Sequence, residues 1–225
     1  MRDYRQPPSP EKGGRRSTIG DAGENAGDTQ GGWRRPIRLA AAVLGAISLG
    51  VISIPAGAAD TADLWAALRS GGHVVVMRHA LAPGTGDPQS FDVGKCETQR
   101  NLSTQGRAQA KRIGDSFRAN GIAGARVYSS QWCRCLDTAE LLRLGPVATL
   151  PALNSFFQTI GRRTPQTAAL QKWLSEQDRT TPLVLVTHQV NITALTGIYP
   201  ASGEMVVLRI EQDGALKTIG TMRPD

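Results

Sequence analysis

Two histidines and two arginines in this 225-residue chain follow segments whose sequences are typical of strands. The segments are 73–77, 126–129 and 183–187. Arg78 and His79 directly follow the first segment, and His188 directly follows the third. Arg134 lies shortly after the second. A neutral imidazole can attack a phosphoryl group, and planar guanidinium groups can hold the oxygens of that group. These residues suit phosphoryl transfer, with His79 as the nucleophile and the other three side chains stabilising negative charge.

Helix-like and strand-like segments alternate from residue 60 to the end of the chain. Ser103 is predicted to cap the second helix, whose buried face carries Ala110, Ile113 and Phe117 at helical spacing. Other helices are predicted at 61–69, 133–143 and 164–177, and strands at 73–77, 126–129, 147–150, 183–187, 204–210 and 216–222. This alternation predicts an α/β fold, a three-layer α/β/α sandwich with a mainly parallel sheet and an antiparallel pair at one edge. Sites in such sheets are built at the carboxyl ends of the strands, where the histidines and arginines lie.

Four segments resemble, in the same order, motifs of the histidine phosphatase superfamily, the phosphoglycerate-mutase-like group. They read VMRH at 76–79, NLSTQGRAQA at 101–110, SSQWCRCLDTA at 129–139 and VLVTH at 184–188. The resemblance spans about residues 72–210. It implies a phosphoglycerate-mutase-like fold and a phosphohistidine intermediate on His79, with Arg78, Arg134 and His188 around the phosphate.

The chain lacks large insertions and in this respect resembles the small phosphatases of that superfamily. We therefore predict an exported phosphomonoesterase of the histidine acid phosphatase type, which acts on a small phosphorylated substrate and needs no cofactor or metal. A cell-envelope sugar phosphate is one candidate substrate, and it comes from the resemblance alone. The alternatives are a phosphomutase or phosphotransferase of the same superfamily and a phosphate-binding module without catalysis.

The proton donor for the leaving group is the missing part of the pattern. Many members of the superfamily place a glutamate in the segment that reads LNSFF at 153–157 here. Asp87 is the first candidate to replace it, because the loop after the first strand is long enough to fold over the site. Glu204 is the second candidate and Glu97 is the third.

The first 58 residues differ in composition from the rest of the chain. Residues 1–32 contain too few large apolar side chains to form a core and are predicted to be disordered. Residues 33–58 combine arginines, an apolar run and small residues in the order of a signal peptide. The predicted phosphatase domain is 59–225, in the periplasm or secreted, with no stable membrane span after cleavage. The alternative is a membrane anchor formed by residues 39–55.

The net charge of +7 is shared between the two parts of the chain, with +4 from residue 60 onward. This modest excess, without a basic motif interleaved with aromatic residues, predicts no nucleic-acid partner.

The three cysteines, Cys96, Cys133 and Cys135, lack the spacing of a structural zinc site. In an exported protein they predict one disulfide, from Cys96 to either Cys133 or Cys135.

Overall fold

The computed structural model describes residues 60–224 of the chain. The predicted disordered extension 1–32 and the predicted signal segment 33–58 lie outside this range, as does residue 59. Within the range, no helix combines the length and the hydrophobicity needed to cross a membrane.

The described residues form a six-stranded sheet with the strand order β3-β2-β4-β1-β5-β6. The strands are β1 His73–Arg78, β2 Arg126–Ser129, β3 Val147–Thr149, β4 Leu183–Thr187, β5 Met205–Ile210 and β6 Leu216–Met222. The pairs β1–β4, β2–β4 and β2–β3 are parallel, whereas β5 runs antiparallel to both β1 and β6. The mainly parallel sheet with antiparallel pairing at one edge is thus confirmed.

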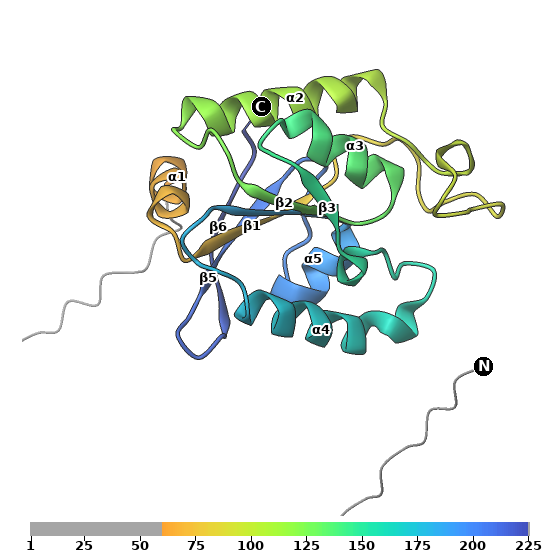
Figure 1. Cartoon of the computed structure of the whole chain (residues 1–225). Helices are drawn as coiled ribbons and strands as arrows, with labels where there is room; N and C mark the ends of the chain where they lie inside the picture. Colours follow the sequence, from red (N-terminus) through yellow and green to blue (C-terminus); the bar gives the residue numbers. More distant parts are fainter. Residues whose placement is uncertain (1–59, 225) are drawn as a thin grey trace, which may run out of the picture. The chain divides into compact units, whose positions relative to one another are not determined.

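Helices cover both faces of this sheet (Figure 1). They are α1 Thr61–Ser70, α2 Thr104–Ala119, α3 Cys133–Leu142, α4 Arg163–Ser175 and α5 Gln189–Thr196. One core cluster joins α1, α2 and α3 to the sheet, and a second joins α4 and α5 to its other face. Both faces of β4 are buried, which explains why its sequence is uniformly apolar rather than alternating. The predicted three-layer α/β/α sandwich is confirmed.

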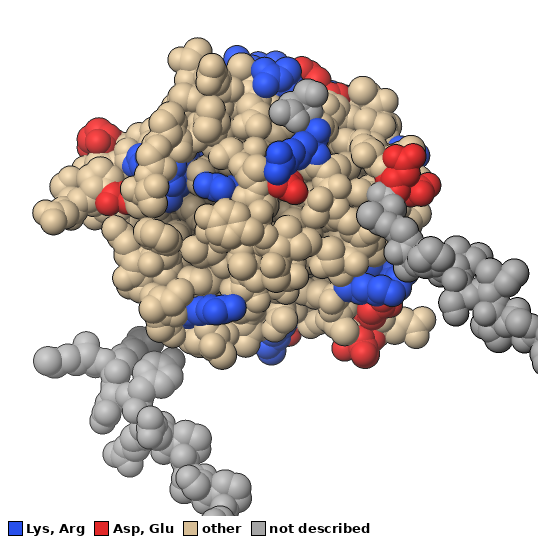
Figure 2. All heavy atoms as spheres, turned by 180° about the vertical axis from the view of Figure 1, so that it is seen from behind, with Lys and Arg blue, Asp and Glu red and all other residues tan. Residues whose placement is uncertain are grey.

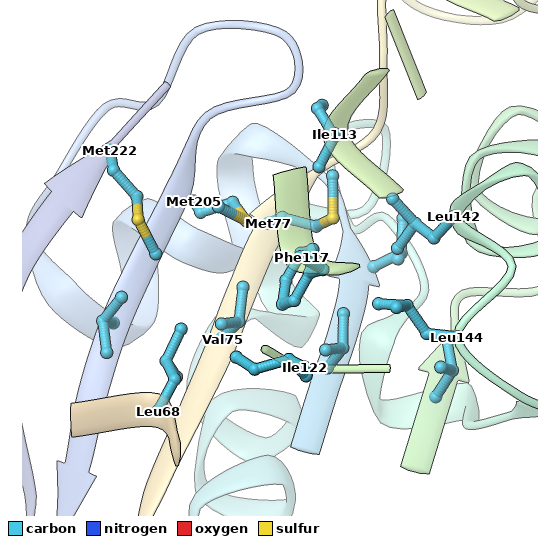
Figure 3. Packing of buried hydrophobic residues seen from close by; sticks show 14 of the residues in the cluster. Leu68, Val75, Met77, Ile113, Phe117, Ile122, Leu142, Leu144, Met205 and Met222 are labelled. Carbon is cyan, nitrogen blue, oxygen red and sulfur yellow. The ribbon is translucent and has the colours of Figure 1, made fainter. Parts of the chain in front are cut away.

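Helix α2 follows its sequence signals closely. The Ser103 hydroxyl accepts a hydrogen bond from the Gly106 N–H at 3.0 Å and so caps the helix. Ile113 and Phe117 are each 1 % exposed, and both belong to the same core cluster as Met77 of β1 (Figure 3). The buried face of this helix therefore contributes to the core on one side of the sheet.

The connections at the carboxyl ends of the strands contain structure that the sequence did not predict. Three short 3₁₀ helices lie there: η1 Cys96–Thr98, η2 Pro151–Leu153 and η3 Ile160–Arg162. The long connection between β1 and α2 is anchored at its end, because the Ser103 N–H donates to the Leu81 carbonyl at 3.1 Å. Gly106 permits this approach, since a Cβ there would overlap the same carbonyl oxygen.

Candidate active site

The register of the sheet brings the carboxyl ends of β1, β2 and β4 together. Arg78 lies opposite Thr187, and Ser129 lies opposite Val186. The polar residues that follow these strands open onto a cavity of about 350 Å³. All five predicted site residues line it: Arg78, His79, Asp87, Arg134 and His188.

The His79 imidazole is 2 % exposed and has a fixed orientation. Its Nδ1 lies 2.8 Å from the Ala80 carbonyl oxygen. A carbonyl only accepts hydrogen bonds, so Nδ1 carries the proton and Nε2 keeps its lone pair. Burial, followed by the positive charge of Arg134, lowers the pKa of His79 to about 3. The ring is therefore neutral at physiological pH, as a nucleophile must be.

The His188 imidazole packs edge-on against that of His79, with ring centroids 5.6 Å apart. The Arg134 Nη2, which can only donate, is 3.4 Å from His188 Nδ1. Nδ1 therefore accepts, and Nε2 donates to the Ser130 hydroxyl at 2.8 Å. Burial, followed by the charge of Arg134, lowers the pKa of His188 well below its usual value.

Arg134, in the first turn of α3, is held by Asp87 from the β1–α2 connection. The Arg134 Nη1 donates to Asp87 Oδ1 at 2.6 Å, and Nη2 donates to Oδ2 at 3.1 Å. Asp87 also accepts from the Trp132 Nε1–H at 3.0 Å and from the Arg100 backbone N–H at 3.2 Å. Arg134 Nε is buried and has no hydrogen-bond partner among the described residues.

Arg78 and Arg100 also bring guanidinium groups to the cavity, which Arg162 lines as well. The Arg78 Nη1 donates to the Pro200 carbonyl at 3.0 Å, and its Nε is buried without a partner within residues 60–224. Arg100 donates through Nε to the Gly86 carbonyl at 2.8 Å and through Nη1 to the Ala82 carbonyl. Burial lowers the pKa of both arginines, but a guanidinium group remains charged at neutral pH. The cavity thus presents a neutral histidine among arginines, an arrangement suited to a phosphate.

This arrangement agrees with a family match. The family model described as "Histidine phosphatase superfamily (branch 1)" matches residues 74–160, which include His79, Arg100 and Arg134. This match places residues 74–160 of the chain in the histidine phosphatase superfamily.

Solved structures agree with this assignment at the level of the fold. The structure of the protein histidine phosphatase SixA complexed with tungstate matches with a TM-score of 0.51 and 19 % identity, over 68 % of this chain and 97 % of that chain. The product of the open reading frame Rv3214 from Mycobacterium tuberculosis matches with a TM-score of 0.50 and 14 % identity, over 65 % and 94 %. A comparison with curated proteins gave no match.

The contacts of Asp87 bear on its predicted role as the proton donor. Burial alone would raise the pKa of Asp87, but the hydrogen bonds and charge of Arg134, together with the hydrogen bonds from Trp132 and Arg100, outweigh burial and lower it. A carboxyl group in this setting is stable in its ionised form, so it carries no proton that it could donate to a leaving group. These contacts oppose the predicted role and fit a role in positioning Arg134.

The other two acid candidates lie away from the cavity. Glu204 is 8 % exposed, and its Oε2 accepts from the Ala201 N–H at 2.7 Å and from Arg223 Nη2 at 3.0 Å. Glu97 is exposed, in η1. Neither residue lines the cavity, so neither carboxylate is placed to protonate a leaving group there.

Asn154 stands in the segment where many members of the superfamily place the acid, but it supports His188 instead. Its Oδ1 accepts from the Ser130 hydroxyl at 3.3 Å and from the Gln131 N–H at 2.9 Å. Asn154 thereby orients the hydroxyl that accepts from His188. The sequence patterns predicted neither this relay nor the place of Arg100 at the cavity. The one signal for Arg100 is its position directly before the segment 101–110 that resembles the superfamily.

The predicted disulfide is present and joins Cys96 to Cys133. Cys133 is the residue before Arg134, and its N–H donates to Gln99 Oε1 at 2.9 Å. The bridge thus ties the β1–α2 connection to the start of α3. Cys135 is the free cysteine of the described residues, and burial raises the pKa of its thiol to about 12.

Proposed function

We propose that this protein is a phosphomonoesterase that forms a phosphohistidine on His79. The observation that carries the proposal is the hydrogen bond from His79 Nδ1 to the Ala80 carbonyl, which leaves a neutral Nε2 in a cavity lined by Arg78, Arg100 and Arg134. The match of residues 74–160 to the histidine phosphatase superfamily supports the same chemistry. The reaction is of the histidine acid phosphatase type.

The reaction has two displacements at phosphorus. In the first, the His79 Nε2 lone pair forms a bond to phosphorus, and the ester P–O bond breaks with its electron pair on the departing oxygen. In the second, a water oxygen attacks the phosphohistidine, the N–P bond breaks, and inorganic phosphate leaves. The proton of that water passes to phosphate or solvent, and His79 returns to its neutral form.

The cationic side chains supply the charge stabilisation that phosphoryl transfer needs. Arg78, Arg100 and Arg134 place guanidinium groups around the position of the phosphoryl oxygens. A bound phosphate dianion would favour protonation of His188, which would turn its Nδ1 into a further donor.

The lack of a placed proton donor among the described residues of the cavity favours one alternative. This alternative is a module that binds phosphate groups without hydrolysing phosphate esters. The carboxylate that faces the cavity is Asp87, and it is paired with Arg134. A phenyl phosphate separates the two functions, because its leaving group needs little protonation and an enzyme with this cavity should still cleave it.

Export and substrate are further parts of the proposal. A signal peptide at 33–58 would direct the domain to the periplasm or the medium, and the Cys96–Cys133 bridge supports an oxidising compartment. A membrane anchor at 39–55 remains the alternative.

Lys and Arg side chains alternate with Asp and Glu on the face in Figure 2 without a continuous basic surface, which supports a small phosphorylated substrate over nucleic acid. A cell-envelope sugar phosphate is a candidate from the resemblance alone.

The test is turnover and trapping with purified protein. Wild-type protein should hydrolyse phenyl phosphate and, quenched early, should hold phosphate that is labile in acid and stable in alkali. His79→Ala should lose both signals, and a chelator should change neither. His73→Ala is the matched control, because His73 begins the same strand and does not line the cavity. Near wild-type phosphate release by His79→Ala would refute the mechanism.

A further inference from the structure

An aromatic wall begins beside the histidines of the site. Four aromatic side chains line the cavity: Phe91, Trp132, Phe157 and Tyr199. The rings of Phe91 and Trp132 are stacked, with centroids 5.0 Å apart and an angle of 23° between their planes. Trp132 in turn packs edge-on against His188, with centroids 5.4 Å apart. The apolar surface therefore extends outward from the place where the phosphate would bind.

Two of these rings have free surface to offer a substrate. Phe157 is 53 % exposed and Tyr199 is 72 % exposed. Phe157 lies beside Gly86 of the opposite loop, since a Cβ on Gly86 would be 3.9 Å from its ring. Exposed aromatic rings at a cavity mouth are costly to hydrate and bind planar apolar groups by stacking or edge contacts. The outer half of the cavity thus suits an aromatic leaving group.

The acid–base chemistry of the cavity also favours an aromatic leaving group. Among the described residues, Asp87 supplies the one carboxylate that lines it, and the two hydrogen bonds and the charge of Arg134 keep that carboxylate ionised. A leaving oxygen must therefore depart without a proton from a carboxylic acid of the described residues. A phenol has a pKa of about 10 and can leave as a phenolate, whereas water and aliphatic alcohols are much weaker acids, so an alkoxide is a far poorer leaving group.

We propose that the cavity selects phosphate monoesters of phenolic hydroxyl groups, which include simple aryl phosphates and phosphotyrosine. The proposal rests on the function proposed above. His79 Nε2 bonds to phosphorus, the P–O bond to the aromatic ring's oxygen breaks, and the phenolate departs and takes a proton from water. The leaving ring lies against the aromatic wall formed by Phe91, Trp132, Phe157 and Tyr199.

The first experiment measures kcat/KM, which reports formation of the phosphohistidine. The substrates are a series of substituted phenyl phosphates, glycerol phosphate and glucose phosphate, with free phosphotyrosine and a phosphotyrosine peptide as arms that separate the two sources. Phenyl phosphate should exceed glycerol phosphate by about 10²-fold or more, the scale that a missing general acid costs a poor leaving group. Within the phenyl series, kcat/KM should fall steeply as the pKa of the phenol rises.

The second experiment separates binding by the wall from the intrinsic reactivity of aryl esters. Phe157→Ala should reduce the ratio of kcat/KM for phenyl phosphate to that for glycerol phosphate by about 3- to 10-fold, as expected for one lost aromatic contact. Val93→Ala is the matched control, since Val93 is 40 % exposed and does not line the cavity. It should leave that ratio unchanged.

The two proposals fail in different ways. If glycerol or glucose phosphate is cleaved as fast as phenyl phosphate and the activity depends on His79, the enzyme stands and the aryl preference is wrong. An unchanged ratio in Phe157→Ala would also overturn the aryl preference. If no ester is cleaved and no phosphate is trapped, the proposed function fails and the aryl preference fails with it.

Discussion

Asp87 accepts hydrogen bonds from Arg134 through both carboxylate oxygens, at 2.6 and 3.1 Å. The side chain of Asp87 is 7 % exposed and that of Arg134 is 3 % exposed. The residues are 47 positions apart, one in the connection after β1 and the other in the first turn of α3. A bidentate pair fixes the plane of the guanidinium group as well as its position. Asp87 therefore determines how Arg134 faces the cavity.

Asp87→Asn tests this positioning role. The amide keeps the size of the side chain but loses the charge, so Arg134 should lose its fixed orientation. We expect kcat/KM to fall about 10- to 100-fold, in line with the loss of hydrogen bonds to a charged group. The loss should be similar for an aryl and an alkyl phosphate, because a positioning residue affects both.

A proton donor would behave differently. If Asp87 gave the leaving group its proton, Asp87→Asn would slow the alkyl ester far more than the aryl ester. A strongly unequal loss would contradict the positioning role and restore Asp87 as the acid. Thermal unfolding of the variant should be measured alongside, because removal of one partner of a buried ion pair destabilises the fold by about 3–5 kcal/mol.

Arg134→Lys tests the planar fork itself. An ammonium group keeps the charge but cannot bind Asp87 and a phosphate with two parallel hydrogen bonds. We expect kcat/KM to fall on the order of 10²-fold, the scale for removal of one preorganised donor. Arg107→Lys is the matched control, because Arg107 pairs with Asp137 at 2.7 Å on the surface. Unchanged kinetics in Arg134→Lys would show that another arginine holds the phosphate.

The fold could be predicted where burial dictates the sequence. Leu183–Thr187 is buried along its whole length, and for this reason its apolar sequence predicted both ends of β4 correctly. On α2, Ala110 and Phe117 lie on one face at helical spacing, and both are buried. Because the carboxyl ends of parallel strands lie at one edge of a sheet, the strand assignments also predicted that Arg78, His79 and His188 lie close together.

The missed features depend on contacts between distant segments. No local pattern links Asp87 to Arg134, and the position of Asp87 predicted its place in the cavity but not its partner. Arg100 lacks a periodic signal because it lies in an irregular connection. The role of Asn154 comes from Ser130 and Gln131 across the sheet edge, which only the tertiary fold places beside it.

The Cys96–Cys133 bridge should stabilise both the fold and the site. It closes a loop with a sequence separation of 37, for which the loss of chain entropy in the unfolded state corresponds to about 3–4 kcal/mol. Cys96→Ser should therefore lower the free energy of unfolding by an amount of this order. Because Cys133 precedes Arg134, kcat/KM should also fall.

Cys135→Ala is the control for the bridge, since it removes a thiol and leaves the disulfide intact. Non-reducing mass spectrometry of exported protein should find one bridge and one free thiol. Three free thiols in that protein, or equal stability of Cys96→Ser and wild type, would contradict a stabilising bridge.

The free energy of unfolding should depend on pH because two histidines of the site are buried in a neutral form. Burial, then the charge of Arg134, lowers the pKa of His79 to about 3 in the folded protein, against about 6.5 in an unfolded chain. Between these values the unfolded chain binds a proton that the folded protein does not. The free energy of unfolding therefore falls as the pH falls from about 6.5 toward 3, and His188 acts in the same direction.

Urea unfolding of wild type and His79→Gln between pH 8 and pH 5 measures this contribution. At pH 5 the His79 term amounts to about 2 kcal/mol, so the variant should lose that much less stability than wild type on acidification. Above pH 7 the two curves should run parallel, because the imidazole is neutral in both the folded and the unfolded state. Parallel curves down to pH 5 would mean that His79 takes up its proton in the folded protein. The neutral nucleophile would then be lost at acidic pH, and kcat/KM would fall with it.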